Sequence, residues 1–386
     1  MSKIFELEPK QVWKHFYSLT QIPRPSKKEA KVIEFMKNFG ESIGLETIVD
    51  GIGNVIIRKP ATPGMENRMG IIFQGHLDMV PQKNSDKVHD FEKDPIDAYV
   101  DGEWVTANGT TLGADNGMGC AAAMAVLEAT DLVHGPVEAL FTIDEETGMT
   151  GAKELKPGFL KGHILMNLDS EDEGELYVGC AGGVDVNVSM NYPEIATPAG
   201  FVAYNLAVTG LKGGHSGMDI NIGRSNSNKL LFRFLNHCIY HFDLKLAEVK
   251  GGSLRNAIPR ESFATVILPE KEAAAFEAEV KQFESIFSAE FAKTEPGLKM
   301  TAEKTAAPAK IIAQEEMVKI IKATFACPHG VERMSDAMPG LVETSNNLAI
   351  VKCIDGQYTV NCLVRSSVDS AKMEATARKS RLSLIS

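Results

Sequence analysis

The chain has 386 residues, of which 44% are hydrophobic and 24% are charged. This length predicts two or three domains, each with a core of its own, and this composition excludes collagenous, disordered and coiled-coil proteins. There are 40 Lys and Arg residues against 51 Asp and Glu residues, a net charge of −11, which argues against nucleic acid or an anionic membrane as a partner.

The first half of the chain alternates helical and strand patterns. Ser26 and Glu29 have the spacing of a capping box before a helix whose apolar residues continue to Ile43. Strands that alternate with helical patterns, such as residues 119–129, predict an α/β sheet covered on both faces. The predicted strands are 45–50, 54–59, 71–74, 104–107, 137–143 and 164–168.

From Phe201 onward the pattern becomes that of an α+β domain. Two similar series of elements predict two related halves. Pro193, Pro198 and Gly200 punctuate the chain before this change, so we place a first domain at 1–190, a second domain at 191–373 and a tail at 374–386. The predicted strands are 201–209, 245–250, 261–268, 341–352 and 357–365, and the helices are 224–240, 270–293, 314–325 and one that starts at 369.

The N-terminal residues carry charges in every turn, and no stretch reaches 18 uninterrupted apolar residues. Neither a signal peptide nor a membrane span is predicted, so we expect a cytoplasmic protein. The six cysteines form no Cys-x-x-Cys pair, which favours reduced, buried thiols over disulfides or a structural zinc site. They are Cys120, Cys180, Cys238, Cys327, Cys353 and Cys362.

A histidine and an aspartate follow one predicted strand. The run 71–75 leads into His76, Leu77 and Asp78. Because side chains alternate along a strand, His76 and Asp78 project to the same side. A metal-binding imidazole usually donates its second N–H to a carboxylate, and Asp78 is placed to accept it. Polar residues at a strand end are also typical of turns, so this pair alone leaves both interpretations open.

Acidic residues occupy comparable positions elsewhere. Asp115 lies just before a helical pattern, where an aspartate is also a common N-cap. Three consecutive acids follow the strand 137–143, where a surface turn that solvates them is the alternative. Asp169 follows the next predicted strand. The three consecutive acids are Asp144, Glu145 and Glu146.

Taken together, these side chains lie at the carboxyl ends of strands, where an α/β sheet has its ligand crevice. Converging carboxylates require a cation, and oxygen and imidazole donors suit zinc, manganese or cobalt. The acids are too many for one tetrahedral ion, so two bridged metal ions are predicted. Asp115 would bridge them, His76 and Asp169 would complete one site, and Glu146 would belong to the other. Glu145, beside a ligand but left free, would be the general base.

Six motifs occur in the order that characterises one enzyme family. From its first residues to about Met373, the chain resembles the aminoacylhistidine dipeptidases (Xaa-His dipeptidase, peptidase D), which belong to the cocatalytic-zinc metallopeptidases. The motifs are GHLDMVPQK, LGADNGMG, FTIDEETGMTGA, MNLDSEDEGELYVGCAGG, GLKGGHSGMDI and SLRNAIPRE.

This resemblance implies a catalytic α/β domain, an α+β lid domain, and hydrolysis of carnosine-like dipeptides with a C-terminal histidine through a metal-bridged hydroxide. It implies that the Asp115–Asn116 peptide is cis and that His215 hydrogen-bonds the tetrahedral oxyanion from the lid. Asn256 and Arg365 match substrate-holding positions, Arg365 at the C-terminal carboxylate. A homodimer is a further expectation, and whether His215 serves its own subunit or another stays open.

The chain departs from the family after Met373. Family members continue with a segment that returns to the catalytic domain and supplies another histidine ligand, whereas residues 374–386 do not match it. We therefore expect a truncated or frame-shifted chain whose catalytic sheet has uncovered apolar surface and an unpaired edge. His237, His241 and His329 match no ligand motif and are expected to be structural or exposed.

Other functions fit the sequence less well than a dipeptidase. A truncated remnant would bind one metal through His76, Asp115 and Asp169 without turnover. A serine hydrolase is poorly supported because Ser216 lies outside any G-x-S-x-G turn. A nucleotide site is not supported, because GADNGMG lacks the G-x-G-x-x-G spacing and a following Lys-Ser/Thr.

Overall fold

A computed structural model describes residues 3–170, 174, 176 and 181–380 of the chain. By its internal contacts the chain divides into two compact units, residues 1–177 (unit 1) and residues 178–386 (unit 2). Unit 1 is an α/β unit and unit 2 is an α+β unit, which confirms the predicted fold class. No helix in the described part of the chain is long and apolar enough to cross a membrane.

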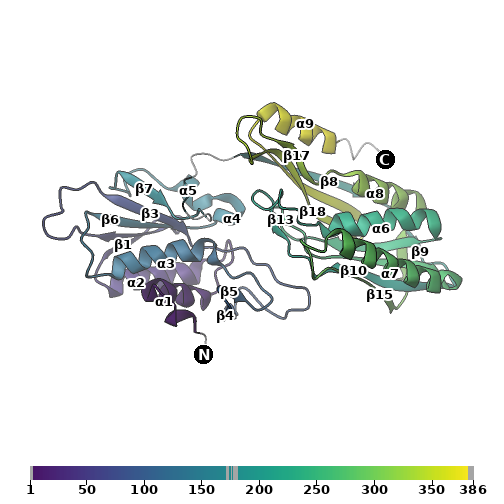
Figure 1. Cartoon of the computed structure of the whole chain (residues 1–386), viewed down its shortest axis with the longest axis horizontal. Helices are drawn as coiled ribbons and strands as arrows, with labels where there is room; N and C mark the ends of the chain where they lie inside the picture. Colours follow the sequence, from purple (N-terminus) through teal and green to yellow (C-terminus); the bar gives the residue numbers. More distant parts are fainter. Residues whose placement is uncertain (1–2, 171–173, 175, 177–180, 381–386) are drawn as a thin grey trace. The chain divides into compact units, whose positions relative to one another are not determined.

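Unit 1 is built on a five-stranded mixed sheet in the order β1-β2-β6-β3-β7 (Figure 1). Strand β3 runs parallel to both β6 and β7, while β2 runs antiparallel to β1 and β6. All six residues of β6 are buried, as expected for a central strand covered on both faces. The strands are β1 (Glu46–Val49), β2 (Val55–Lys59), β3 (Ile71–His76), β6 (Val137–Thr142) and β7 (Ile164–Asn167).

Three helices gather on one face of this sheet: α1 (Lys10–Thr20), α2 (Ala30–Ser42) and α3 (Ala114–Glu128) (Figure 1). They share a hydrophobic core with the sheet, while a smaller cluster around Ile56 and Ile72 lies apart from it. The short elements of the unit are a 3-10 turn (Ile4–Glu6), α4 (Glu145–Gly148) and α5 (Thr150–Glu154).

The prediction that residues 104–107 belong to the main sheet is wrong. They form β5 (Trp104–Ala107), which pairs with β4 (Ala98–Asp101) in a separate two-stranded hairpin. Two residues, Gly102 among them with a φ of 61°, connect the strands. A tight turn of this kind favours local pairing over insertion into a distant sheet.

The predicted helix after Glu29 is confirmed as α2, but its predicted capping box is wrong. Glu29 lies at the N-cap and makes no side-chain hydrogen bond to the first turn. The Ser26 hydroxyl donates to Asp78 instead, at 2.8 Å. Both side chains are therefore engaged away from the helix that their spacing predicted.

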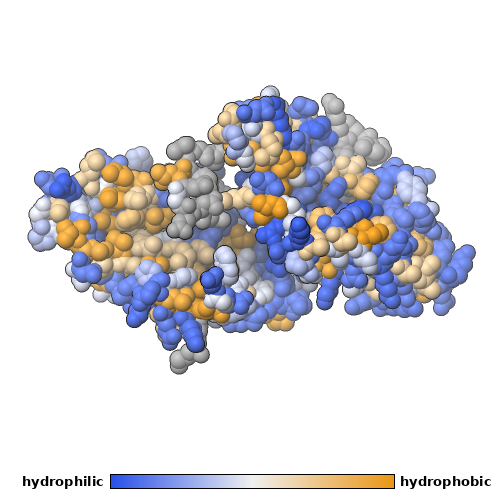
Figure 2. All heavy atoms as spheres, in the orientation of Figure 1, coloured by the Kyte–Doolittle hydropathy of each residue, from blue (hydrophilic) through white to orange (hydrophobic). Residues whose placement is uncertain are grey.

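Strand β7 is an exposed sheet edge. It pairs with β3 on one side, and no strand of the described chain pairs with its other side. Ile164, Leu165 and Met166 are 41%, 51% and 45% exposed, and hydrophobic residues gather over this part of unit 1 in Figure 2. The expected unpaired edge and uncovered apolar surface are therefore present, and such an edge favours association with further strands.

Unit 2 is built on an eight-stranded antiparallel sheet in the order β15-β10-β14-β12-β18-β19-β8, with β17 beside β18. Its four helices contribute residues to one hydrophobic core with the sheet. The strands are β8 (Gly182–Asn191), β10 (Phe201–Thr209), β12 (Lys245–Gly251), β14 (Ser262–Pro269), β15 (Lys299–Thr305), β17 (Gly330–Met334), β18 (Val342–Ile354) and β19 (Gln357–Ser366), and the helices are α6 (Ser227–His241), α7 (Ala273–Glu290), α8 (Gln314–Ala326) and α9 (Asp369–Ser380).

Unit 2 includes residues on both sides of the predicted second domain. Residues 182–190, which the sequence pattern places in the first domain, belong to β8 and pair with β19 of unit 2. Helix α9 includes the start of the predicted tail, while residues 381–386 lie outside the described residues, as does Cys180. The other five cysteines are buried free thiols. The two related halves stay a prediction.

Candidate metal centre

His76 and Asp78 lie at the carboxyl end of β3 and contact each other as predicted. His76 Nδ1 lies 3.3 Å from Asp78 Oδ1, and both side chains are buried. The Asp78 carboxylate also accepts hydrogen bonds from the backbone N–H groups of Glu145 and Glu146, at 3.0 and 3.2 Å. Because β3 and β6 are parallel neighbours, the turns that follow them meet, and Asp78 joins them.

Asp115 reaches the same place from the first turn of α3. Its Oδ1 lies 2.8 Å from His76 Nε2. The Asp115–Asn116 peptide is cis, as the family resemblance implied. The Asn116 side chain donates to the carbonyl of Leu168, at 3.1 Å, and to the Asp169 carboxylate. The start of α3 is therefore bound to the segment that follows β7.

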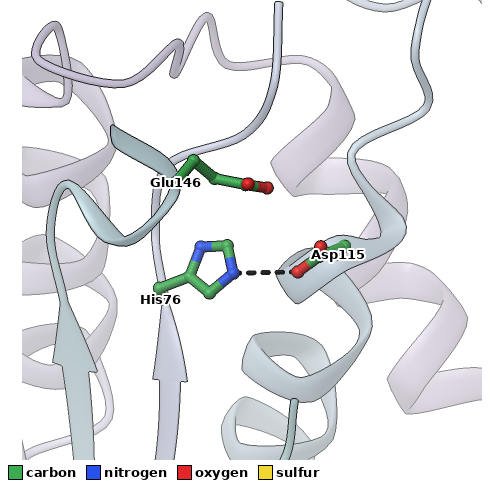
Figure 3. Close-up of side chains that lie close together, drawn as sticks. All are labelled: His76, Asp115 and Glu146. Carbon is green, nitrogen blue, oxygen red and sulfur yellow. Dashed lines mark hydrogen bonds and ion pairs between the residues drawn. The ribbon is translucent and has the colours of Figure 1, made fainter. Parts of the chain in front are cut away.

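Glu145 and Glu146 follow β6 through Asp144, whose φ of 51° turns the chain sharply. One ligand atom from each of His76, Asp115 and Glu146 lies within 4.8 Å of the others, and the Glu146 carboxylate points toward the other two in Figure 3. Asp169 Oδ1 lies 3.5 Å from His76 Nε2. The structure thus brings the four predicted metal ligands together.

Burial and the interactions among these side chains shift their pKa values. Burial first, and the nearby Asp115 second, raise the pKa of Glu146 to about 8. Burial also raises the pKa of Glu145. Burial alone would lower the pKa of His76, but its hydrogen bonds to Asp115, Asp169 and Asp78 raise it well above its usual range. Burial alone would raise the pKa of Asp169, but its contacts with His76, Asn116 and Asp115 together lower it.

This donor set fits divalent metal ions. Imidazole nitrogen and carboxylate oxygen are the ligands that zinc, manganese and cobalt accept, and a cation among the carboxylates would relieve the repulsion that raises the pKa of Glu146. The Asp78 carboxylate beside His76 Nδ1 is the usual outer partner of a metal-binding imidazole.

A second group of acids lies beside the candidate metal centre and shares Asp78 with it. One carboxylate oxygen from each of Glu29, Asp78 and Asp144 lies within 4.8 Å of the others, and all three residues are buried. The Asp144 carboxylate accepts from the hydroxyls of Thr147 and Thr150. These carboxylates bind protein donors, so we assign them to support of the turns and not to metal binding.

The other predicted site residues lie in unit 2 and cluster there. Arg365 Nη2 lies 3.2 Å from His215 Nε2, and Arg365 Nε donates to the Ser216 hydroxyl at 3.3 Å. The Ser216 N–H donates to the carbonyl of Asn256 at 2.8 Å, beside the pairing of β11 (Gly214–His215) with β13 (Ala257–Ile258). His215, Asn256 and Arg365 therefore share one local site within their unit.

His237, His241 and His329 belong to no cluster of three potential metal ligands among the described residues. His329 is partly buried and contacts the Asn226 side chain at 3.2 Å. His237 stacks on His241 with ring centres 4.0 Å apart and contacts Glu279 at 2.9 Å. These contacts agree with the structural role that we expected.

Sequence reasoning missed several residues around the centre. Arg24 is 2% exposed and donates to main-chain carbonyls of two ligand-bearing turns. Glu29 was interpreted only as a helix cap. A single sequence carries no signal for these roles, because the partners are 53 to 115 residues away along the chain. For Asn116 there was only one indication in the sequence, the cis Asp115–Asn116 peptide that the family resemblance implied.

Gly119 in α3 must remain without a side chain for this centre to form. A Cβ atom there would lie 2.1 Å from Asn116 Oδ1 and 2.7 Å from the carbonyl oxygen of Leu168. We expect Gly119→Ala to weaken zinc binding by about tenfold or more, because the clash displaces the contacts that position Asp169. Zinc titration of the purified variant measures this.

Gly51→Ala is the matched control, since nothing lies within 4 Å of a Cβ atom at that position. It should bind zinc as the unmodified chain does. Equal zinc affinity in the Gly119→Ala variant would show that the contacts of Asn116 do not shape the centre.

Comparison with known proteins agrees with this site. Residues 72–359 match Peptidase family M20/M25/M40, which is most of the chain. The chain belongs to this family. It is thus a hydrolase of peptide bonds, and the predicted relationship to the aminoacylhistidine dipeptidases is confirmed by the similarities that follow.

The chain is similar to three further proteins. It is 45% identical over 372 residues to the cytosol non-specific dipeptidase of Escherichia coli (strain K12), covering 96% of this chain and 77% of that protein. The crystal structure of aminoacylhistidine dipeptidase from Vibrio alginolyticus has 47% identity and a TM-score of 0.57, covering 100% of this chain and 78% of the other. The uncharacterized protein YqjE of Bacillus subtilis (strain 168) is 30% identical over 174 residues, 42% of this chain and 43% of that protein.

Proposed function

We propose that this chain is a metal-dependent dipeptidase that hydrolyses dipeptides with a C-terminal histidine. One observation carries the proposal: His76, Asp115, Glu146 and Asp169 gather at the carboxyl end of a peptidase-family sheet, with Glu145 beside them. The name of the Vibrio alginolyticus relative supports a C-terminal histidine in the substrate, and the name of the Escherichia coli relative supports dipeptide hydrolysis without that specificity.

Two divalent metal ions, zinc before manganese or cobalt, fit the proposal. His76, Asp115 and Asp169 would hold one ion, and Asp115 with Glu146 would hold the other. When bound, such ions polarise the scissile carbonyl and lower the pKa of the attacking water. The remnant hypothesis with one metal is less favoured, because the chain belongs to Peptidase family M20/M25/M40 and is similar to dipeptidases over most of its length.

The residues of the chain would perform the remaining steps. Glu145, whose pKa is raised by burial, takes the proton of the attacking water and returns it to the leaving amine. His215 donates a hydrogen bond to the oxyanion, and Arg365 binds the C-terminal carboxylate of the dipeptide. Asn256 holds the substrate backbone. A cytoplasmic location and a homodimer stay part of the proposal.

Metal removal tests this function. The chain is treated with EDTA, dialysed and reloaded with Zn²⁺ or Mn²⁺, and histidine release from β-alanyl-histidine is followed with metal content by mass spectrometry. We expect EDTA to abolish hydrolysis and either ion to restore it at about two ions per chain. A chain that binds one ion and releases no histidine is the remnant, and a chain that hydrolyses equally well after EDTA is not a metalloenzyme.

A further inference from the structure

Side chains of the segment Arg24–Glu29 contact the turns that carry the candidate metal centre, although its sequence pattern predicted only a helix start. Ser26 Oγ donates to Asp78 Oδ2 at 2.8 Å. The other oxygen of this carboxylate lies against His76 Nδ1 and accepts the N–H of Glu145. Ser26 therefore holds the carboxylate that joins the turns after β3 and β6.

Glu29 holds the second of these turns through its main chain. Its Oε1 accepts hydrogen bonds from the N–H of Lys27, at 2.9 Å, and from the N–H of Asp144, at 3.1 Å. Asp144 has a φ of 51°, an uncommon backbone conformation for a residue other than glycine, and directly precedes Glu145. The Glu29 carboxylate thus stabilises the sharp turn that presents Glu145 and Glu146.

Arg24 connects the turn after β3 to the start of α3. Its Nη1 donates to the carbonyls of Leu77 and Asp78, at 2.9 and 3.1 Å, and its Nη2 donates to the carbonyl of Gly113. A Cβ atom on Gly113 would lie 2.6 Å from Nη2, so the close approach needs a glycine. A guanidinium can span two chain segments in this way because its donors form a fixed fork.

We propose that Arg24, Ser26 and Glu29 are positioning residues of the metal centre, one segment that sets the three turns carrying its ligands and its base. The inference rests on the proposed function for its catalytic consequence. Its structural content is independent of turnover: these three side chains determine where Asp78, Asp115 and Glu145 lie before any metal or substrate binds.

Pairs of variants test the proposal. Ser26→Ala removes the hydroxyl and Ser26→Thr keeps it, while Glu29→Ala removes the acceptor and Glu29→Gln keeps an oxygen in its place. Lys28→Ala is the control within the segment, because Lys28 is exposed and its Nζ lies 3.7 Å from Glu92. Arg24 is left intact, since removal of a buried guanidinium is expected to compromise folding as well.

Three quantities are measured on the full chain: the Zn²⁺ dissociation constant by competition with a chromophoric chelator, kcat and KM on β-alanyl-histidine, and amide hydrogen exchange of residues 143–147 in the metal-free protein. We expect Ser26→Ala and Glu29→Ala to weaken Zn²⁺ binding by about 10- to 100-fold, to lower kcat with KM within about twofold, and to accelerate exchange. Ser26→Thr and Glu29→Gln should retain most of the affinity, the activity and the protection from exchange.

The outcomes separate this inference from the proposed function. If the unmodified chain hydrolyses no dipeptide, the exchange and Zn²⁺ data still decide the positioning role. Unchanged exchange and Zn²⁺ affinity in both alanine variants would overturn it. Equal losses in Ser26→Thr and Glu29→Gln, or in Lys28→Ala, would do so as well, because a general loss of stability would then explain the data.

Discussion

Glu145→Gln is expected to lower kcat for dipeptide hydrolysis by about 10²- to 10⁴-fold, the usual contribution of a general base. Glutamine keeps the size of the side chain but cannot take a proton from water. The turn itself should persist, because the backbone N–H of Glu145, and not its carboxylate, binds Asp78. Metal content should therefore be unchanged, which separates loss of the base from loss of the centre.

Steady-state kinetics with metal analysis on the same preparation measures this effect. Glu154→Gln on α5 is the matched control, since Glu154 is an exposed glutamate nearby in the chain and makes its ion pair with Lys156. It should retain full activity. If the activity of Glu145→Gln stays within about tenfold of the unmodified chain, Glu145 is not the base.

Asp115→Ala is expected to abolish the stabilisation of the chain by zinc. Asp115 is the predicted bridging ligand and lies 2.8 Å from His76 Nε2 in the ligand group. A ligand that binds only the folded state stabilises it by about 2.7 kcal/mol at about 100 times its dissociation constant. The unmodified chain should gain about this much at saturating Zn²⁺, and the variant should gain little.

Chemical denaturation with and without Zn²⁺ measures the difference for each protein. Asp86→Ala is the control, because Asp86 is exposed and lies outside the ligand group. Zn²⁺ should stabilise the Asp86→Ala variant as strongly as it stabilises the unmodified chain. A variant at Asp115 that is stabilised by Zn²⁺ as strongly as the control would remove Asp115 from the metal centre.

The local patterns of the chain predicted most of the elements in both units. Strands β2, β3, β6 and β7 were recognised because each contains a short, largely apolar run, and α2 and α6 because their apolar residues recur at helical spacing. The hairpin of β4 and β5 was misplaced, since a short apolar run does not specify its partner strand.

The amino-acid sequence by itself predicted which residues are candidate metal ligands and where they stand relative to the helices and strands. His76, Glu146 and Asp169 were predicted as ligands because residue type and position at a strand end are local properties, and Asp115 was predicted from its place at the start of a helical pattern. Only the tertiary structure decided what surrounds them. Arg24, Ser26 and Glu29 act on turns far away along the chain. Contacts of that kind depend on how the sheet and helices pack, and packing is not encoded in any single stretch of sequence.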